Sequence, residues 1–255
     1  MKKILILGGT GYIGDYLSSI LSDTFDVEII GTKTEKKFVI GEDFDPSIID
    51  GADIVLYLSW YFDLSDKKYV DKNVSSFRNV SELCKQNNIN LVFFSTYFAS
   101  NDSLSTYNKT KALCESIALN MGNKVVRLGA VILNNSPQGG IYGNVYKFVK
   151  KFNVFPVIFP NRKKFHLTNS NDLIQLCKDL RFLEKDVNFY CSTEKYKFYD
   201  LFDFHNQRIL KIYIHWRLIY LFLLFCESLG VKLKFHFLEY MWRELLYTRN
   251  LLRNL

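Results

Sequence analysis

The sequence predicts an α/β fold organised around a doubly wound parallel sheet, on three observations. Short apolar runs rich in β-branched residues alternate with longer segments of helical apolar spacing over residues 1 to about 175. The first run, Ile4 to Leu7, is apolar throughout, which is typical of a strand buried on both faces of a parallel sheet. A glycine-rich turn and a helical pattern follow it directly. With 255 residues, 48% of them hydrophobic, the chain is long enough for one such domain and a small additional lobe.

The glycine-rich turn reads GGTGYIG over residues 8–14. Glycine lets such a turn close and lets its backbone approach a pyrophosphate, and the dipole and unpaired N–H groups of the following helix attract that anion. A strand, a glycine turn and a helix N-terminus in this order predict a dinucleotide site. The alternative is a turn whose glycines serve only to pack the helix. The residues predicted to contact the dinucleotide here are Gly8, Thr10, Gly11, Tyr12, Ile13 and Gly14.

The other elements of the predicted core follow from the same patterns. Further strands are predicted at Val27–Ile30, Phe38–Ile40, Asp53–Leu58, Asn90–Phe94 and Lys124–Gly129. Helices are predicted over Tyr12–Leu21, from Ile48 to near Gly51, over Tyr69–Gln86 and from Tyr107 onward. Asp45 is predicted as the N-cap of the short helix, because Pro46 suits the first helical position.

The end of the second predicted strand favours NADP over NAD. An NAD site usually has an acidic residue there, which holds the adenosine ribose hydroxyls. Here the chain reads GTKT over residues 31–34, so Thr32 and Lys33 are predicted to contact the 2′-phosphate of NADP, with NAD as the alternative. A surface lysine without any ligand is the simpler interpretation. Leu58 and Ser59 are predicted to line the cofactor cleft, because doubly wound folds bind ligands at the carboxyl ends of their strands.

Tyr107 and Lys111 form the candidate catalytic pair. They lie four residues apart, and therefore one turn from each other on one face of the predicted helix. A tyrosine with the ordinary pKa of about 10 is a poor proton shuttle at neutral pH. A nearby ammonium lowers that pKa, which suits the pair to general acid–base chemistry. An exposed tyrosine–lysine helix face is the alternative interpretation.

Four motifs in order resemble the short-chain dehydrogenase/reductase superfamily, in particular its nucleotide-sugar epimerase, dehydratase and reductase branch. They are GGTGYIG, Asn73-Val74, Ser95-Thr96 and Tyr107-x-x-x-Lys111. The resemblance covers residues 1 to about 175 and implies a Rossmann-like core. It also implies an NAD(P)-dependent enzyme that reduces or epimerises a nucleotide sugar; Lys33 favours net reduction. A dehydratase is less favoured, because Tyr97-Phe98 stand where such members usually carry an Asp-Glu pair.

The resemblance implies catalytic roles for three side chains. Tyr107 would donate or accept the substrate proton, and Lys111 would tune Tyr107 and hydrogen-bond the nicotinamide ribose. Thr96, or Ser95 in its place, would orient the reacting group of the substrate. Only ten residues separate Thr96 from Tyr107, fewer than in typical extended members of the superfamily, so the resemblance is weaker on the substrate side.

Four more residues take roles implied by the resemblance. Asn73 would help to order the active-site helix and the proton path, and a solvated or capping asparagine is the alternative. Asp43 and Phe44 would flank the adenine of the cofactor. Arg127 would either tie a strand to a loop or contact the ligand directly.

The domain organisation implied by the resemblance has two parts. Residues 1–135 would form the Rossmann dinucleotide-binding core, and residues 136–255 a small C-terminal substrate lobe, with the chain recrossing to the core near residues 165–190. Asp172 is predicted to cap a helix at this recrossing. The basic residues Arg162, Lys163 and Lys164 would bind a nucleotide diphosphate or form a solvated turn.

The last stretch, residues 195–255, is dense in aromatic, leucine and basic residues. Two amphipathic helices in a small lobe explain this composition, and a peripheral contact with a membrane surface is the alternative. Two further functions therefore stay open. One is an epimerase or reductase of lipid-linked sugars at the membrane surface. The other is a non-catalytic cofactor-sensing or scaffold protein of the same fold.

Bulk properties bound the remaining function classes. The formal charge of +7 comes from scattered lysines without a long basic run, so no nucleic-acid partner is predicted. The five cysteines include no C-x-x-C pair and the four histidines show no ligand spacing, so neither a disulfide nor a metal site is predicted. The N-terminus does not read as a signal peptide, and a cytoplasmic protein is expected. A homodimer formed through helices is an expectation from the superfamily.

Overall fold

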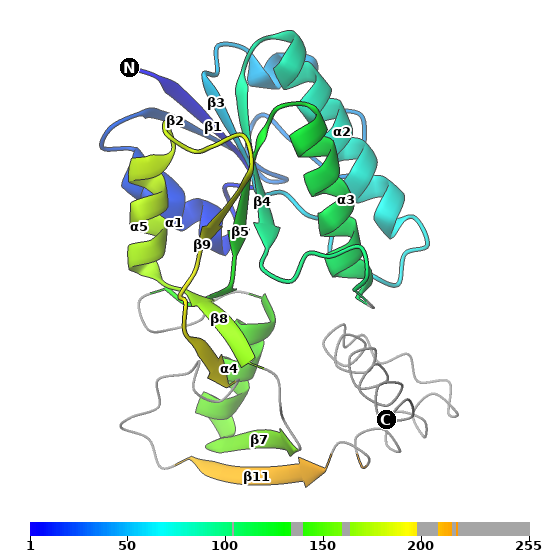
Figure 1. The fold of residues 1–255 in the computed structure, drawn as a ribbon, viewed down its shortest axis with the longest axis vertical. Helices are drawn as coiled ribbons and strands as arrows, with labels where there is room; N and C mark the ends of the chain where they lie inside the picture. The colour runs from blue at the N-terminus through cyan, green and yellow to red at the C-terminus, as the bar shows by residue number, and fades with distance from the viewer. Residues whose placement is uncertain (104, 134–139, 160–163, 198–208, 216–217, 219–255) are drawn as a thin grey trace.

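The computed structural model describes residues 1–103, 105–133, 140–159, 164–197, 209–215 and 218. A six-stranded parallel sheet in the order β2-β1-β3-β4-β5-β9 forms its main body, with helices on both faces (Figure 1). The strands are β1 Lys3–Leu7, β2 Asp26–Ile30, β3 Ile54–Tyr57, β4 Asn90–Thr96, β5 Lys124–Leu128 and β9 Val187–Tyr190. The helices are α1 Tyr12–Leu21, α2 Tyr69–Gln86, α3 Thr106–Asn120 and α5 Ser170–Asp179. The predicted Rossmann-like α/β architecture is confirmed.

Strand β1 contributes side chains to both halves of the core. Ile4 and Ile6 pack in the cluster that includes α1 and α5, whereas Leu5 and Leu7 pack in the cluster that includes α2 and α3. All four side chains are fully buried, as an uninterrupted apolar run predicts for a central parallel strand. Burial of one such side chain stabilises the fold by about 1.5–3 kcal/mol, so this strand anchors both helical layers.

The strand order reverses beside β1, which has β2 on one side and β3 on the other. Ligands of doubly wound sheets bind at such a switch point, outside the carboxyl ends of the strands. Gly8 follows β1 at this point with a φ of +89°, and a Cβ atom there would lie 2.6 Å from the backbone nitrogen of Ser59. The close approach therefore requires glycine, and the turn after β1 lies directly against the end of β3.

The segment Phe38–Ile40, predicted as a strand, does not form one. Its vicinity has a single β-bridge between Gly31 and Lys37, and the chain then turns, with Glu42 N–H donating to the Val39 carbonyl at 3.2 Å. Phe38 is nevertheless buried, with its ring edge-on to the rings of Phe44 and Tyr57. The apolar run thus reflects side-chain burial at the sheet edge without strand pairing.

The two predicted helix caps have different outcomes. Asp45 accepts a hydrogen bond from Ser47 N–H at 2.9 Å and caps η1, a single 3₁₀ turn over Pro46–Ile49, as predicted. The cap of α5 is Asn169 and not Asp172, which lies at the third helical position. Asp172 returns a hydrogen bond to the Asn169 N–H at 2.8 Å, so the two residues form a reciprocal capping box.

A smaller body lies beyond the carboxyl ends of the main sheet (Figure 1). A three-stranded sheet contains β6 Ala130–Val131, β8 Lys164–Thr168 and β10 Lys195–Lys197. Strands β7 Val154–Phe159 and β11 Leu210–His215 pair in parallel, and α4 spans Gly140–Phe152. Val149, Phe155 and Phe165 pack in its separate apolar cluster. The chain then returns to the main body, where α5 contacts α1 and β9 pairs with β5.

Several predictions concern residues that the structure does not describe. Residues 198–208 and almost all of 216–255 are among them, and with them the predicted amphipathic helices and their membrane contact. Arg162 and Lys163 lie outside the described residues too. In the part of the chain that is described, no helix has both the length and the apolar character needed to cross a bilayer.

Candidate active site

The glycine turn over residues 8–14, called the cradle below, joins β1 to the first turn of α1. A Cβ atom on Gly14 would lie 2.5 Å from the Gly9 Cα, so the first turn of α1 packs directly on the preceding loop. At Gly11, by contrast, the nearest obstacle to a Cβ is the Gly8 carbonyl at 3.3 Å, and Thr10 and Gly11 are both exposed. The exposed backbone of Thr10 and Gly11 is therefore open to solvent at the N-terminus of a helix, where the helix dipole favours a bound anion. These residues fit the pyrophosphate of a dinucleotide.

Tyr12 and Ile13 use their side chains for packing. The Tyr12 hydroxyl accepts a hydrogen bond from Leu133 N–H at 2.8 Å, which ties the turn to the segment after β6. Ile13 packs against the apolar cluster that includes α1. The predicted contact of these two residues with a dinucleotide would therefore be made by their backbone.

The end of β2 lies beside the glycine turn. A Cβ atom on Gly31 would lie 2.6 Å from the Thr10 hydroxyl, so the two segments touch. The Thr34 hydroxyl is engaged by its own loop, since it accepts a hydrogen bond from Gly31 N–H at 2.8 Å. Thr32 and Lys33 are exposed in that loop. The structure thus places both beside the cradle and leaves their side chains in solvent.

The two residues predicted to flank the adenine differ in their surroundings. Asp43 is exposed on the loop that follows the unpaired edge segment. Phe44 is half-buried, and its ring lies edge-on to that of Phe38, with the centroids 5.4 Å apart. Phe44 therefore has a packing role already, whereas Asp43 is accessible to a ligand.

Lys111 is the most unusual charged group of the described structure. Its side chain enters the interior from α3, and its ammonium donates a hydrogen bond to the Phe94 carbonyl of β4 at 2.8 Å. Only 5% of the residue is exposed. Burial lowers the pKa of this amine from 10.5 to about 7, and the nearby Cys114 and Glu115 oppose that shift in part. An amine in such surroundings is typical of a functional site.

Aromatic rings surround the Lys111 ammonium. It lies 3.7 Å from the centroid of the Trp60 ring and 5.9 Å from that of Tyr107. The rings of Trp60 and Tyr107 are themselves edge-on, with centroids 5.8 Å apart, and Trp60 Nε1–H donates to the Tyr69 hydroxyl at 2.9 Å. The structure thus brings Tyr107 and Lys111 together as predicted. Trp60 is a site residue that sequence analysis missed, although it follows directly on Leu58-Ser59.

Thr96 and Ser95 end β4, the strand whose Phe94 carbonyl holds Lys111. Because side chains alternate along a strand, the two hydroxyls point to opposite faces of the sheet and are not interchangeable. Thr96 is half-buried and accepts a long hydrogen bond from Phe98 N–H at 3.5 Å. The Ser95 hydroxyl is buried and has no hydrogen-bond partner within the described residues. Thr96 is therefore the more accessible of the two predicted hydroxyls.

Asn73 on α2 fixes the segment that carries Trp60. Its Oδ1 accepts a hydrogen bond from Tyr61 N–H at 2.9 Å, and its Nδ2 donates to the carbonyls of Tyr61 and Tyr69 at 3.1 and 2.9 Å. The residue is almost completely buried. Its amide is thus committed to backbone groups, which fits the predicted ordering role better than direct participation in a proton path.

Helix α3 is held in place by a partly buried ion pair. Arg127 on β5 donates two hydrogen bonds to the Glu115 carboxylate, from Nε at 2.8 Å and from a terminal nitrogen at 2.6 Å. This bidentate geometry fixes both direction and distance between the two elements. Of the two roles predicted for Arg127, the structure supports the one within the protein.

The smaller body reaches the site next to Thr96. The ring of Tyr97 stacks on that of His166 from β8, with centroids 3.8 Å apart and an interplanar angle of 31°. His166 Nδ1 lies 2.7 Å from the Ser192 carbonyl, which can only accept, so the neutral ring carries its proton on Nδ1. This contact places β8 beside the predicted catalytic strand end.

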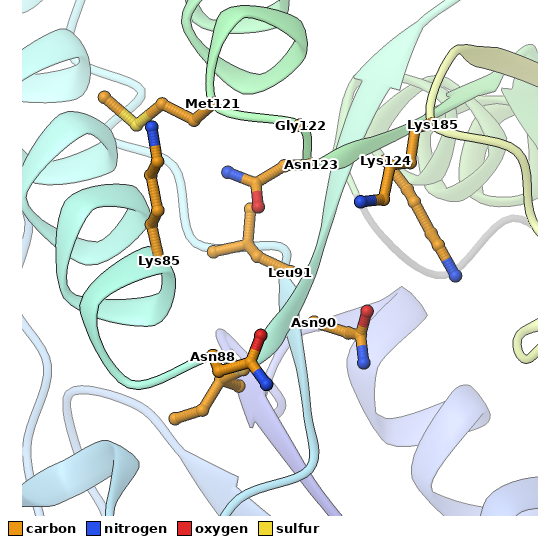
Figure 2. Close-up of a pocket in the computed structure, with 10 residues that line it drawn as sticks. Lys85, Asn88, Asn90, Leu91, Met121, Gly122, Asn123, Lys124 and Lys185 are labelled. Carbon is orange, nitrogen blue, oxygen red and sulfur yellow. The ribbon is translucent and has the colours of Figure 1, made fainter.

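A hollow of about 200 Å³ lies at the opposite edge of the sheet, around the starts of β4 and β5. Figure 2 shows Lys85, Lys124 and Lys185 around it, together with three asparagines. Burial and the charges of Lys185 and Lys2 lower the pKa of Lys124. Because the hollow lies at the amino ends of the strands, it is separate from the candidate active site. Among the described residues, no cluster of histidine, cysteine and acidic side chains suits a metal ion.

No protein-family model and no curated protein sequence matches the chain. The fold is similar to several solved structures. One is MoeE5 in complex with UDP-glucuronic acid and NAD, with a TM-score of 0.69 and 14% identity over 84% of this chain and 85% of that one. Another is UDP-glucuronic acid 4-epimerase from Bacillus cereus, with a TM-score of 0.67 and 17% identity over 84% and 86%. A third is dTDP-4-dehydrorhamnose reductase from Yersinia enterocolitica, with a TM-score of 0.64 and 19% identity over 86% and 85%.

These likenesses confirm the predicted resemblance at the level of the fold. The similar structures include both epimerases and a reductase, so the fold does not separate the two reactions.

Proposed function

We propose that this chain is an NAD(P)-dependent oxidoreductase that acts on a nucleotide sugar, as a keto-sugar reductase or an epimerase. One observation carries the proposal: the buried Lys111 ammonium lies against the Phe94 carbonyl, one helical turn from Tyr107, at the strand end that also carries Thr96. A lysine buried in this way without a carboxylate contact lowers stability, and such a cost is typical of functional sites. Structures of the same fold that hold a UDP-sugar and NAD support the assignment of the ligand class.

The cofactor would be bound along the switch point between β1 and β3. The pyrophosphate would lie against the glycine turn, held by the N–H groups of the first turn of α1 and by the dipole of that helix. The N–H groups of Gly8, Gly9 and Gly11 donate to carbonyls of the protein itself. Leu58 and Ser59, which follow β3 beside Gly8, would line the cleft toward the nicotinamide. When bound, the nicotinamide would supply or accept a hydride.

The protein itself would manage the proton. Tyr107 would give a proton to the substrate oxygen, or take one from it, and the Lys111 ammonium would lower the pKa of Tyr107 by favouring its phenolate form. Thr96 would hold the same substrate oxygen by a hydrogen bond and so orient it toward Tyr107. Lys111 would also donate to the nicotinamide ribose, since an ammonium has three N–H donors and the Phe94 carbonyl uses one of them.

A comparison of turnover between the unsubstituted protein and Tyr107→Phe tests the proposed function. The substrates offered are dTDP-4-keto sugars with NADPH or NADH, which test reduction, and UDP-glucose and UDP-glucuronic acid with NADP⁺ or NAD⁺, which test epimerisation, because epimerisation begins with hydride transfer to an oxidised cofactor. We expect turnover of at least one of them, reduced about 100- to 10,000-fold by the substitution, with unchanged cofactor affinity. Cofactor binding without turnover of any sugar would favour a cofactor-sensing or scaffold protein. Full turnover by Tyr107→Phe would refute the assigned role of the hydroxyl.

The preference for NADP is part of the proposal. Thr32 and Lys33 are exposed beside the glycine turn, where a 2′-phosphate would meet them, and no acidic residue occupies that loop at residues 31–34. Lys33→Ala should weaken NADPH binding about 10-fold and leave NADH binding unchanged, as measured by titration of cofactor fluorescence. A parent that binds NADH more tightly than NADPH would contradict the preference while leaving the reaction class untouched.

A further inference from the structure

The buried ammonium of Lys111 has no ion-pair partner among the described residues. Among the described residues its ammonium donates one hydrogen bond, to the neutral Phe94 carbonyl, and no acidic side chain there lies within ion-pair distance of it. The nearest carboxylate along the helix, that of Glu115, is occupied by the two hydrogen bonds from Arg127. No ion pair therefore holds the ammonium in place within the described structure, although the charge of Glu115 favours its protonated form.

The strongest remaining interaction is with the face of Trp60. The Lys111 nitrogen lies 3.7 Å from the centroid of this ring, closer than it lies to the rings of Phe93 at 4.8 Å or Tyr107 at 5.9 Å. Indole is the aromatic group that attracts a cation most strongly, and the attraction grows when the pair is removed from water. Lys111 is 5% exposed and Trp60 half-buried, so the ammonium meets this ring largely out of contact with water.

The indole is itself fixed from two directions. Its Nε1–H donates to the hydroxyl of Tyr69, a residue that is only 2% exposed. The next residue, Tyr61, is clamped through both its N–H and its carbonyl by the buried amide of Asn73. The ring therefore has little freedom to leave the ammonium.

We propose that Trp60 is a positioning residue that keeps the Lys111 ammonium charged and in place beside Tyr107. The consequence for turnover rests on the proposed function, whereas the effect on the ionisation of Lys111 does not. Without the indole, Lys111 would lose its charge at a lower pH, and with it the ability to favour the Tyr107 phenolate.

Other titratable groups near Lys111 do not provide an alternative. On α3 they are Cys114, whose pKa burial raises to about 12, and Glu115, paired to Arg127 of β5. Burial also raises the pKa of Tyr69, at the start of α2, and of Tyr57 on β3. Tyr107 is the remaining group, and Tyr107→Phe controls for it.

The test measures the ionisation of Lys111 directly in the full chain without cofactor. The protein is labelled with ¹³C at lysine Cε, the Lys111 resonance is identified by its absence from Lys111→Met, and its shift is followed against pH. We expect Trp60→Leu to lower the pKa of Lys111 by about one unit, since the lost cation–π attraction is of that size, and Trp60→Phe to lower it by less. Phe62→Leu, which replaces a neighbouring ring that is 67% exposed, is the matched control and should change nothing.

A Lys111 pKa that is unchanged or raised in Trp60→Leu would overturn the inference. Tyr69→Phe, which removes only the partner of the indole N–H, provides a milder variant if Trp60→Leu does not fold, and a downward shift is expected there too. In turnover, the alkaline limb of the pH profile should move to lower pH in Trp60→Leu and move back in part in Trp60→Phe. A shifted pKa without any sugar turnover would refute the proposed function alone, and turnover with an unshifted pKa would refute the Trp60 inference alone.

Discussion

Replacement of Lys111 by methionine should make the protein more stable at neutral and mildly acidic pH. The pKa of Lys111 falls from 10.5 to about 7 because the side chain is buried. One pKa unit corresponds to about 1.4 kcal/mol, so holding the charged amine in the folded state costs about 5 kcal/mol at pH 6. Methionine has a similar length and no charge. It forfeits the hydrogen bond to the Phe94 carbonyl and the cation–π contact with Trp60, which together are worth about 2–3 kcal/mol, so a net gain of about 2–3 kcal/mol remains.

The sign of the pH dependence follows from the lowered pKa. Below about pH 7 the amine is charged in both the folded and the unfolded chain, so the full cost is present. Between about pH 7 and the unfolded value of 10.5 the unfolded chain binds more protons than the folded one, so the parent gains stability as the pH rises. The advantage of Lys111→Met should therefore shrink by about 1.4 kcal/mol per pH unit and be close to zero near pH 9.

Urea unfolding of the cofactor-free protein at pH 6, 7, 8 and 9 measures this difference. The matched control is Lys109→Met, because Lys109 is exposed on the same helix and its replacement should have a small effect that does not follow this pH dependence. Destabilisation by Lys111→Met at pH 6 would refute the reasoning. So would a stability difference that does not change with pH, since it would show that Lys111 has an ordinary pKa in the folded protein.

Three further substitutions test the frame of the site. In urea unfolding, Gly8→Ala should cost several-fold more free energy of unfolding than Gly51→Ala. Both residues have a positive φ, +89° and +73°, but only at Gly8 would a Cβ atom meet backbone, 2.6 Å from the nitrogen of Ser59. Gly51→Ala should therefore cost only about 1 kcal/mol. Glu115→Gln should lower the free energy of unfolding by about 3 kcal/mol because it leaves Arg127 without its partner. Glu28→Gln, which breaks more solvent-accessible pairs to Lys3 and Lys36, should cost at most about 1 kcal/mol. Asn73→Ala should speed hydrogen exchange of the Tyr61 amide by at least about 10-fold, since it removes a hydrogen bond worth roughly 1–2 kcal/mol. Asn87→Ala, which replaces the exposed asparagine at the end of α2, should leave that exchange rate unchanged. Equal effects within any of these pairs would contradict the role assigned to its first member.

The parts of the fold that were predicted correctly are those that local chemistry determines. The run Ile4–Leu7 has no polar interruption, and only a strand covered on both faces can bury it. The glycines after it mark a turn that a side chain would block, as the contact of Gly8 with Ser59 shows. Tyr107 and Lys111 share one helical face by their spacing alone. Each of these features could be read within a window of about seven residues.

The features that sequence analysis missed depend on contacts between distant segments. Trp60 lies over Lys111, 51 residues further along the chain, and no local pattern indicates that contact. The sequence also did not indicate how deeply Lys111 is buried, because β4 and the segment after β3, which lie far from Lys111 in the chain, pack around its side chain. The predicted strand Phe38–Ile40 failed for a related reason. Apolar residues show that a segment is buried, but pairing requires a neighbouring strand edge that the sequence does not identify.

The site combines strong anchors with one unfavourable charge. Asn73 fixes the segment that carries Trp60, the Arg127–Glu115 pair fixes α3, and both anchors are distant from the reacting atoms of the proposed chemistry. Between them lies an amine whose charge is disfavoured by burial and stabilised by the Phe94 carbonyl and the face of Trp60. A protein that binds neither cofactor nor substrate would have no use for that amine, because methionine would fill the same space and stabilise the fold. A gain of stability together with a loss of turnover in Lys111→Met would thus show that the amine serves catalysis or cofactor binding and not the fold.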